Sequence, residues 1–332
     1  MAYRLAIAGV TGAVGQEFLS IIEQRNFAFK SIKMLASSRS AGKTMSFKGK
    51  TYTIEEMTKD SFKDVDVALF SAGASRSREF APAAVKAGAV VVDNSSAYRM
   101  DPEVPLVIPE INPEMIKKHK GIIANPNCST IIGIVPIWPL HKINPVKRMV
   151  VSTYQAASGA GMSAMLELEN QSREILEGKP PTKNVFPHQI AFNCFSHNSA
   201  LGPNGYNEEE TKLVKETRKI FNCPNIAVTA TCVRIPVMRA HCESINLEFT
   251  NPITPDEVRN LLKTAPGVTI LDDREHNRFP MPIDASGKDD VFVGRIRQDE
   301  SLPGNRGINL WVSGDQLRKG AALNAIQIAE LL

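Results

Sequence analysis

The feature that most constrains the fold is a group of three glycines that follows an apolar segment near the start of the chain. Residues 3–8 are predicted to form a buried strand, and Gly9, Gly12 and Gly15 come next. Apolar residues then recur with a helical period up to about residue 24. Glycines at such a strand-to-helix turn let backbone N–H groups approach a pyrophosphate. The spacing is GxxGxxG instead of GxGxxG, so it is the strand–turn–helix context that predicts a dinucleotide site.

Strands and helices alternate through the N-terminal part of the chain. Strands are predicted at 31–36, 65–70 and 89–93, and a helix at 75–87 is expected to end at Gly88. This alternation is typical of an α/β fold with a parallel, doubly wound sheet, that is, a Rossmann-type dinucleotide-binding domain. A length of 332 residues favours a second domain.

A pattern richer in strands begins near residue 128. We expect a nucleotide-binding domain over 1–127, then an α+β catalytic and dimerisation domain with a mixed sheet over 128–314. A helix is predicted at 162–177, and residues 178–207 are expected to form a long loop, either a lid or an interface arm. An amphipathic helix at 315–332 is expected to complete the first domain. The predicted strands of the second domain are 149–153, 225–234, 244–250, 268–271, 291–297 and 308–312.

Composition disfavours several classes of protein. The start of the chain shows no secretory signal, and the longest apolar run, IIGIVPIWPL, is too short to span a bilayer. A net charge of +4 from scattered basic residues disfavours nucleic-acid binding. The five cysteines form no CxxC pair, so we expect reduced thiols, no metal site and a cytoplasmic location. The missing signal and the short apolar run lead us to expect no membrane association.

The end of the second predicted strand indicates which dinucleotide binds. NAD sites place Asp or Glu there to bind the ribose 2′-OH, but this segment reads ASSRSAGK. It has no carboxylate, and a guanidinium with several hydroxyls suits a 2′-phosphate. We therefore predict NADP as the cofactor. Its predicted contacts in this domain are Gly9, Thr11, Gly12, Ala13, Val14, Ser37, Arg39, Ser40, Ala72 and Gly73.

Cys128 stands apart from the other cysteines. It follows Asn127 at a predicted helix N-terminus, where the partial positive charge favours the thiolate and backbone N–H groups, with Asn127, are placed to hold an oxyanion. Beside a nicotinamide, such a thiolate allows a two-step reaction. It displaces phosphate from an acyl phosphate to form a thioester, and hydride then reduces the thioester to an aldehyde. The remaining thiols lack this setting and are interpreted as small apolar residues: Cys194, Cys223, Cys232 and Cys242.

The motifs SSAYRM, NPNCST, TYQAASGAG, EExK and RIPVxRAH occur in this order. With them the chain resembles the aspartate-semialdehyde dehydrogenase family over nearly its whole length, in the branch that carries NPNCST instead of GGNCTV. The resemblance implies a phosphorylating, NADP-dependent aldehyde dehydrogenase that reduces L-aspartyl 4-phosphate to L-aspartate 4-semialdehyde and releases phosphate. This step leads toward lysine, through diaminopimelate, and toward threonine and methionine. A homodimer is also implied, and a tetramer stays open.

The resemblance assigns roles to particular residues. It implies Cys128 as the nucleophile, His241 as the general acid/base and Gln155 as the residue that orients the acyl group. It implies Arg234 as the clamp on the substrate α-carboxylate and Glu209 as the partner of its ammonium. Further implied residues are Lys212 and Arg99 for phosphate, Ser158 and Gly159 near the nicotinamide, and Gln316 for the cofactor.

Residue chemistry alone leaves some of these assignments open. Arg234 and His241 are seven residues apart, which puts them on opposite faces of a continuous strand, so a bend is needed between them. Arg239 competes with Arg234 for the carboxylate. Glu209 and Lys212 share a helical face and would also make an ordinary solvated ion pair. The other histidines are interpreted as structural: His119, His141, His188, His197 and His276.

Three other functions are weighed as alternatives. N-acetyl-γ-glutamyl-phosphate reductase has a similar fold and chemistry, but its substrate has no free ammonium for Glu209 to bind. A non-catalytic, NADP-binding regulatory homologue should have lost the thiol, the base or the carboxylate clamp, and this chain keeps all three. Glyceraldehyde-3-phosphate dehydrogenase shares the thioester chemistry, but its SCTTN-type motif is absent.

Overall fold

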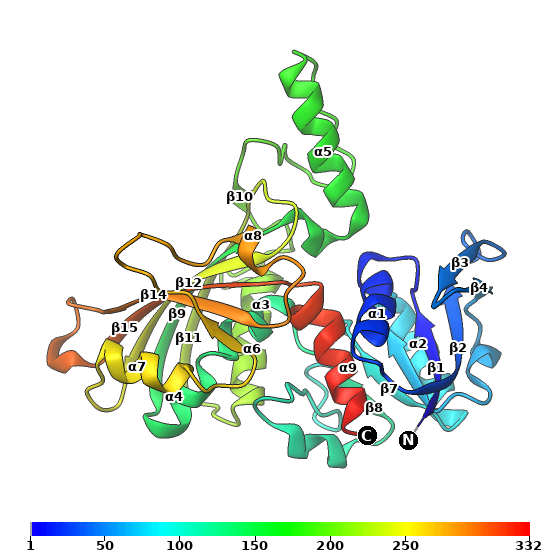
Figure 1. Cartoon of the computed structure of the whole chain (residues 1–332), viewed down its shortest axis with the longest axis horizontal. Helices are drawn as coiled ribbons and strands as arrows, with labels where there is room; N and C mark the ends of the chain where they lie inside the picture. Colours follow the sequence, from blue (N-terminus) through cyan, green and yellow to red (C-terminus); the bar gives the residue numbers. More distant parts are fainter. Residues whose placement is uncertain (1) are drawn as a thin grey trace. The chain divides into compact units, whose positions relative to one another are not determined.

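The computed structural model describes residues 2–332, which form two compact units (Figure 1). The first unit comprises the chain up to Asn127 together with Ala321–Leu332. The second unit comprises Cys128–Gly320, so the predicted nucleophile is its first residue.

The sheet of the first unit is parallel throughout, as the alternating pattern predicted. Its strand order is β5-β2-β1-β6-β7-β8. The chain proceeds outward in one direction from β1 and in the other from β6, so the carboxyl ends of these two strands flank a topological switch point. The strands are β1 (Tyr3–Ala8), β2 (Phe29–Ala36), β5 (Glu55–Glu56), β6 (Val67–Phe70), β7 (Val90–Asp93) and β8 (Ile122–Ala124).

Helices cover both faces of this sheet. Leu5 and Ile7 of β1 belong to one apolar cluster with α1 (Ala13–Gln24) and α9 (Leu323–Glu330), while Ala6 and Ala8 belong to another with α2 (Ala74–Lys86). Alternate residues of a strand point to opposite faces, so β1 is buried on both sides and reads as a continuous apolar run. Smaller elements of the unit are β3 (Thr44–Phe47), β4 (Lys50–Thr53) and the 3-10 turns Lys59–Phe62 and Pro113–Lys118.

The C-terminal segment differs from the amphipathic helix expected at 315–332. Arg318–Ala322 form a π-helical turn, and the α-helix α9 begins only at Leu323. In α9 every residue except Gln327 and Glu330 is buried. The helix contacts both α1 and β7, so it is covered on nearly all sides and needs no polar face.

The second unit is built on a mixed sheet of order β10-β11-β9-β12-β15-β14-β13. Its central strands pair β9 parallel with β11 and antiparallel with β12. The strands are β9 (Val146–Gln155), β10 (Phe195–Ser196), β11 (Ala227–Arg234), β12 (His241–Phe249), β13 (Val268–Ile270), β14 (Val291–Gln298) and β15 (Gly307–Gly314). The helices are α3 (Cys128–Ile134), α4 (Trp138–Ile143), α5 (Met162–Leu176), α6 (Glu208–Ile220), α7 (Pro255–Leu262) and α8 (Pro282–Ala285), with 3-10 turns at Ala157–Ala160 and Pro303–Asn305.

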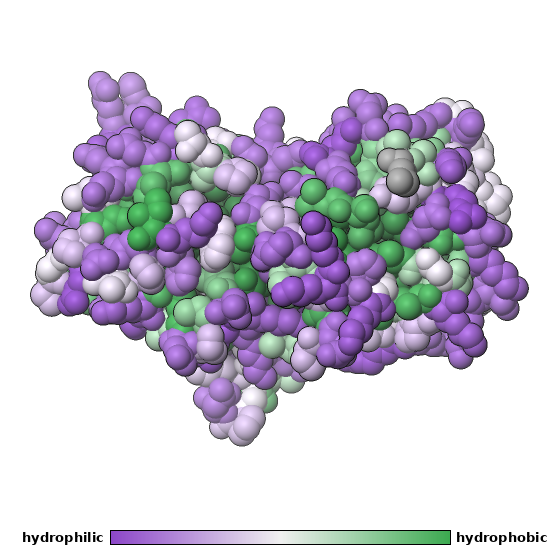
Figure 2. Space-filling view, turned by 90° about the horizontal axis from the view of Figure 1, so that it is seen from below, coloured by the Kyte–Doolittle hydropathy of each residue, from purple (hydrophilic) through white to green (hydrophobic). Residues whose placement is uncertain are grey.

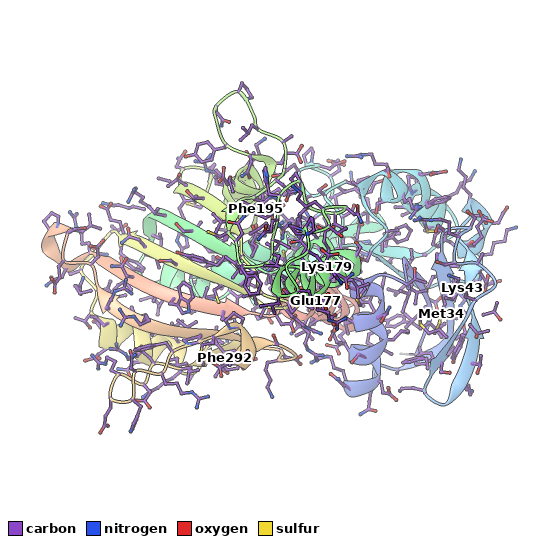
Figure 3. The ribbon with its side chains drawn as sticks, turned by 90° about the horizontal axis from the view of Figure 1, so that it is seen from above. Met34, Lys43, Glu177, Lys179, Phe195 and Phe292 are labelled. Atoms are coloured by element: carbon purple, nitrogen blue, oxygen red, sulfur yellow. The ribbon has the colours of Figure 1, made fainter. Side chains whose placement is uncertain are left out.

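Helix α5 projects from the body of the second unit (Figure 1). The expected loop over 178–207 returns from it, and its only strand is the two-residue β10, which includes Phe195 (labelled in Figure 3). The loop is held by buried polar side chains of α5. The Glu167 carboxylate accepts the backbone N–H groups of three successive loop residues, and Gln171 Oε1 accepts two more. Residues 184–191 are therefore fixed to α5.

No helix within residues 2–332 is long and apolar enough to cross a membrane. The face drawn in Figure 2 is mostly hydrophilic and carries apolar areas between the polar groups.

Candidate active site

A cavity of about 400 Å³ lies in the first unit, at the carboxyl ends of β1, β2 and β6. This is the position where open α/β sheets bind dinucleotides. Three cations line the cavity, and no carboxylate is found among the described residues of its lining. The lining residues are Gly9, Thr11, Gly12, Ala36, Ser37, Arg39, Ser40, Lys43, Met57, Ser71, Ala72 and Arg76.

Most of the predicted cofactor contacts of this unit meet in the cavity. Ala13, Val14 and Gly73 do not line it; they begin the helices α1 and α2 beside it. Arg76 is a lining residue that sequence reasoning missed. The available signal was a basic residue in the first turn of the helix that follows β6.

The glycines of the first turn are required by close backbone contacts. Gly9 has φ +92°, and a Cβ there would lie 2.4 Å from the carbonyl oxygen of Ser71. A Cβ on Gly15 would lie 2.2 Å from the carbonyl oxygen of Gly9. Helix α1 therefore packs directly against the turn, and only glycine allows that approach.

In the second unit, the sheet brings three predicted catalytic residues together. Gln155 is the last residue of β9, and Arg234 pairs with it from β11. His241 begins β12 on the other side of β9, where Cys242 pairs with Tyr154. The bend required between Arg234 and His241 is present, because the chain leaves β11 after Arg234 and enters β12 at His241.

His241 is fully buried, and its ring orientation is fixed by the backbone. The N–H of Ala156 donates to Nδ1 at 3.0 Å, so the neutral ring carries its proton on Nε2. Nε2 has no hydrogen-bond partner in the part of the chain that the structure describes. Burial, followed by the charge of Arg234, lowers the pKa of His241 to about 3. The side chain is therefore a neutral donor.

Arg234 is buried, and no carboxylate of residues 2–332 is bonded to it. Its Nη1 donates to the carbonyl oxygen of Ala156 at 3.3 Å and its Nη2 to Nε2 of His197 at 2.8 Å, while Nε has no partner within residues 2–332. Arg239, its competitor, bonds at 2.7 Å to the buried carboxylate of Asp315. The guanidinium that is free of an ion pair is therefore Arg234, which favours it as the carboxylate clamp.

Gln155 links the sheet to helix α6. Its Nε2 donates to Glu209 Oε1 at 3.2 Å, and Thr153 Oγ1 donates to its Oε1 at 3.2 Å. Glu209 Oε2 pairs with Lys212 Nζ at 3.1 Å. Glu209 is only 5% exposed, so the pair is not the solvated one that residue chemistry alone would allow. The capping box of Asn207 begins α6 here and places the pair beside Gln155.

Cys128 is the first residue of α3. Burial lowers the pKa of the Arg234 guanidinium, and the nearby charge of Cys128 opposes this effect. A Cβ on Gly320 would lie 2.8 Å from the Cys128 Cβ, so Gly320 backs the thiol. Burial raises the pKa of the Cys242 thiol to about 11 and that of Cys232 further. Cys194, interpreted as a small apolar residue, is exposed.

The neighbouring glycine turn faces the same groups. A Cβ on Gly159 would lie 2.9 Å from Arg234 Nη1 and 3.1 Å from His241 Nε2. Ser158 Oγ accepts from Gln316 Nε2, and Gln316 Oε1 accepts the backbone N–H of Ala240 at 2.9 Å. These predicted cofactor residues thus belong to the second unit, and Gly159 lies against Arg234 and His241.

Two of the residues predicted for catalysis or substrate binding lie in the first unit. Arg99 is buried, and it donates to the carbonyl oxygens of Asn125 at 2.9 Å and Asn94 at 2.7 Å. Asn127 is buried at the end of the unit. A second residue that sequence reasoning missed is His197, interpreted as structural, which bonds to Arg234. No local motif marks it, because the contact depends on the pairing of β10 with β11.

Glu243, two residues after His241 on β12, is fully buried, and neither carboxyl oxygen has a hydrogen-bond partner in the described chain. Burial raises its pKa well above its usual value, so above about pH 4.5 the folded chain binds this proton more tightly than the unfolded chain does. Rising pH therefore favours the unfolded state through this group. We expect Glu243→Met to raise the free energy of unfolding at pH 7.5 by about 1–3 kcal/mol and to lose this advantage near pH 4.5.

Urea denaturation of the wild type and of the variant at both pH values measures this effect. Glu248→Met, at a half-buried position of the same strand, is the control and should show no such pH-dependent gain. A variant at Glu243 that is no more stable than the wild type at pH 7.5 contradicts the prediction.

Two family models match the chain. The model described as semialdehyde dehydrogenase, NAD binding domain, matches residues 4–119, and the one described as semialdehyde dehydrogenase, dimerisation domain, matches residues 137–319. A Synechocystis protein named aspartate-semialdehyde dehydrogenase is 57% identical over 99% of this chain and 97% of its own length. A protein of that name from Aquifex aeolicus is 54% identical over 100% of this chain and 98% of its own.

Solved structures agree with these relatives. Aspartate semialdehyde dehydrogenase II from Vibrio cholerae, complexed with ASA, matches with a TM-score of 0.97 at 45% identity, over 100% of this chain and 98% of that one. An aspartate semialdehyde dehydrogenase with NADP from Candida albicans matches with a TM-score of 0.76 at 26% identity, over 100% and 98%.

Proposed function

This chain belongs to the aspartate-semialdehyde dehydrogenase family, and from that membership we propose that it reduces L-aspartyl 4-phosphate with NADPH to L-aspartate 4-semialdehyde and phosphate. The observation that carries the proposal is the arrangement around Gln155. A buried guanidinium without an ion pair lies on one side, the donor of His241 on the other, and a buried carboxylate bonds to Gln155 itself.

This arrangement fits an amino-acid substrate. Arg234 offers its unpaired Nε–H to the α-carboxylate, and Glu209 offers a carboxylate to the α-ammonium. Lys212 adds a cation for phosphate, and Arg99 of the first unit is proposed as the second. N-acetyl-γ-glutamyl phosphate has no ammonium to compensate the buried Glu209, so this alternative is disfavoured.

Cys128 is proposed to attack the acyl carbon as the thiolate. Its S–C bond forms as the C–O bond to phosphate breaks, and phosphate leaves with the electron pair. Bound NADPH supplies the hydride that reduces the resulting thioester. Collapse of the tetrahedral species then breaks the C–S bond, releases the aldehyde and restores the thiolate, and the one proton consumed is carried by phosphate.

Family membership implies that His241 is a general acid/base. Its hydrogen bonds favour the role of an acid, that is, a donor through Nε2–H. Nδ1 is occupied by the N–H of Ala156, which leaves the proton on Nε2. We propose that Nε2–H donates to the acyl oxygen as negative charge develops there. Because the pKa of His241 is low, its ring stays neutral near pH 7, and the Nε2–H donor is present there.

An NAD(P)-binding domain is present, and we propose that NADP is preferred. The cavity residues fit a 2′-phosphate because Ser37, Arg39, Ser40 and Lys43 follow β2 without a carboxylate. Arg39→Leu is expected to raise the KM for NADP⁺ about thirtyfold, which is the loss of a charge-assisted contact, and to leave the KM for NAD⁺ unchanged. Initial rates with each dinucleotide measure this, and an equal loss with both contradicts it.

The second unit matches a dimerisation domain, and we propose a homodimer as the assembly, with a tetramer as an outcome that mass photometry or sedimentation would reveal. We place the enzyme in the cytoplasm, on the basis of its reduced thiols and its NADP-dependent biosynthetic chemistry.

The reverse reaction tests the function. We expect NADPH to form from NADP⁺ when the purified protein receives L-aspartate 4-semialdehyde and phosphate, and no NADPH to form without phosphate. A preference for N-acetyl-glutamate semialdehyde would transfer the chain to the alternative substrate class. Cofactor binding without turnover of either aldehyde would point to the regulatory homologue.

A further inference from the structure

We propose that His197 is a positioning residue for the substrate carboxylate, because its imidazole holds the Arg234 guanidinium in place and connects it to helix α6. This inference rests on the proposed function, and it assigns a role to a histidine that no motif of the sequence singled out. It follows from a chain of hydrogen bonds that leads from the clamp to the helix.

The hydrogen bonds determine the state of the imidazole. Arg234 Nη2 lies 2.8 Å from His197 Nε2, and a guanidinium can only donate, so Nε2 accepts and the ring proton lies on Nδ1. Nδ1 lies 3.0 Å from Ser199 Oγ and also faces the backbone N–H of Ser199 at 3.2 Å. Because Nε2 accepts from Arg234, the neutral ring carries its proton on Nδ1 and donates it to the hydroxyl. The same hydroxyl oxygen accepts the backbone N–H of Glu209 at 3.2 Å. Arg234, the carboxylate clamp, is thus linked to the residue proposed to bind the ammonium.

The surroundings keep His197 neutral. Burial, followed by the charge of Arg234, lowers its pKa to about 4, against the opposing effect of Glu209. Because the imidazole is neutral, it can accept from Arg234 without cancelling the charge that the substrate carboxylate needs. A carboxylate at this place would neutralise Arg234 and compete with the substrate, whereas an imidazole orients the guanidinium and leaves its charge available.

The backbone makes His197 a rigid support. Phe195 and Ser196 form β10 and pair with Arg234 and Val233 of β11, and the N–H of His197 donates to the carbonyl oxygen of Cys232 at 2.8 Å. Besides His197, the described residues give Arg234 one hydrogen bond, of 3.3 Å to Ala156, and the ring of Phe186 at 5.7 Å. Without the imidazole, a side chain with several rotatable bonds would be held only by these weaker contacts.

Three substitutions distinguish the contact of Nε2 with Arg234 from the contact of Nδ1 with Ser199. His197→Phe keeps an aromatic ring and removes both bonds. His197→Gln places an amide oxygen near the position of Nε2 and can still accept from Arg234, whereas His197→Asn matches Nδ1 and cannot. His188→Phe is the control, because His188 is exposed in the same loop and contacts the ring of Phe195.

We expect His197→Phe and His197→Asn to raise the KM for L-aspartate 4-semialdehyde about tenfold while kcat changes less than about threefold. His197→Gln should restore most of the KM, and His188→Phe should behave as the wild type. With 3-aminopropanal, which lacks the carboxylate, the wild type and His197→Phe should have similar kcat/KM values. The KM for NADP⁺ should not change in any variant.

The outcomes are distinguishable. A wild type that turns over no aspartate semialdehyde overturns the proposed function itself. An active wild type with an unchanged KM in His197→Phe overturns the role of His197, as does a His197→Gln variant as impaired as His197→Phe. A loss that persists with 3-aminopropanal also overturns it, because the defect would then not act through the carboxylate.

Discussion

Alanine in place of Cys128 is expected to lower the turnover of L-aspartate 4-semialdehyde by about 10⁴-fold or more, the usual consequence of removing a covalent nucleophile. No neighbouring thiol is suited to replace it. Cys242 follows His241 directly, but burial raises its pKa to about 11, and burial raises that of Cys232 even further. Binding of NADP⁺ should be retained, because the dinucleotide cavity belongs to the first unit and does not include Cys128.

Absorbance of NADPH measures the turnover, and protein fluorescence titrated with NADP⁺ measures binding. Cys194→Ser is the matched control, since this thiol is exposed and belongs neither to the dinucleotide cavity nor to the residues around Gln155. A Cys128→Ala protein that keeps more than a few per cent of the wild-type rate would falsify the thioester mechanism. A variant that also fails to bind NADP⁺ is to be checked for folding by its thermal transition before the rate is interpreted.

Substitution of Arg234 by methionine is expected to lower kcat/KM for aspartate semialdehyde about 100- to 1,000-fold, because the substrate carboxylate loses a buried charged partner. The same change should leave stability unchanged or raise it. Within residues 2–332 Arg234 is buried without an ion pair, although the charge of Glu209 acts on it, and a buried guanidinium costs desolvation free energy. We therefore expect Arg234 to contribute more to binding than to folding.

Arg239→Met should give the opposite result. Arg239 pairs with the fully buried carboxylate of Asp315, so its removal leaves a buried charge and is expected to lower the free energy of unfolding by about 3 kcal/mol. Denaturant titrations and steady-state kinetics of both variants distinguish the two arginines. The assignment fails if Arg239→Met has the larger effect on the KM of the semialdehyde and Arg234→Met the larger effect on stability.

Local patterns were sufficient for the first strand and helix of the first unit, but not for its short strands β3, β4, β5 and β8. β1 was predicted at its observed bounds, and helix α1 extends to Gln24 as expected, because the chemistry of the strand-to-helix turn lies within a few consecutive residues. The C-terminal helix was predicted less well. Its apolar period was read as one amphipathic helix, but α9 is enclosed by elements from the opposite end of the sequence, and local periodicity does not report this burial.

The motif containing Cys128 and the glycine turn were determined by the sequence alone, because each depends on neighbours within a few residues along the chain. The observation that favours Arg234 over Arg239 as the proposed clamp, the ion pair of Arg239 with Asp315, comes only from the tertiary structure. So do the donor state of His241 and the role proposed for His197. In each of these cases the deciding contact comes from another strand or loop, namely Asp315, Ala156 or β10. Spacing along the chain carries no information about such contacts, because strand pairing brings together residues that the sequence separates by tens of positions.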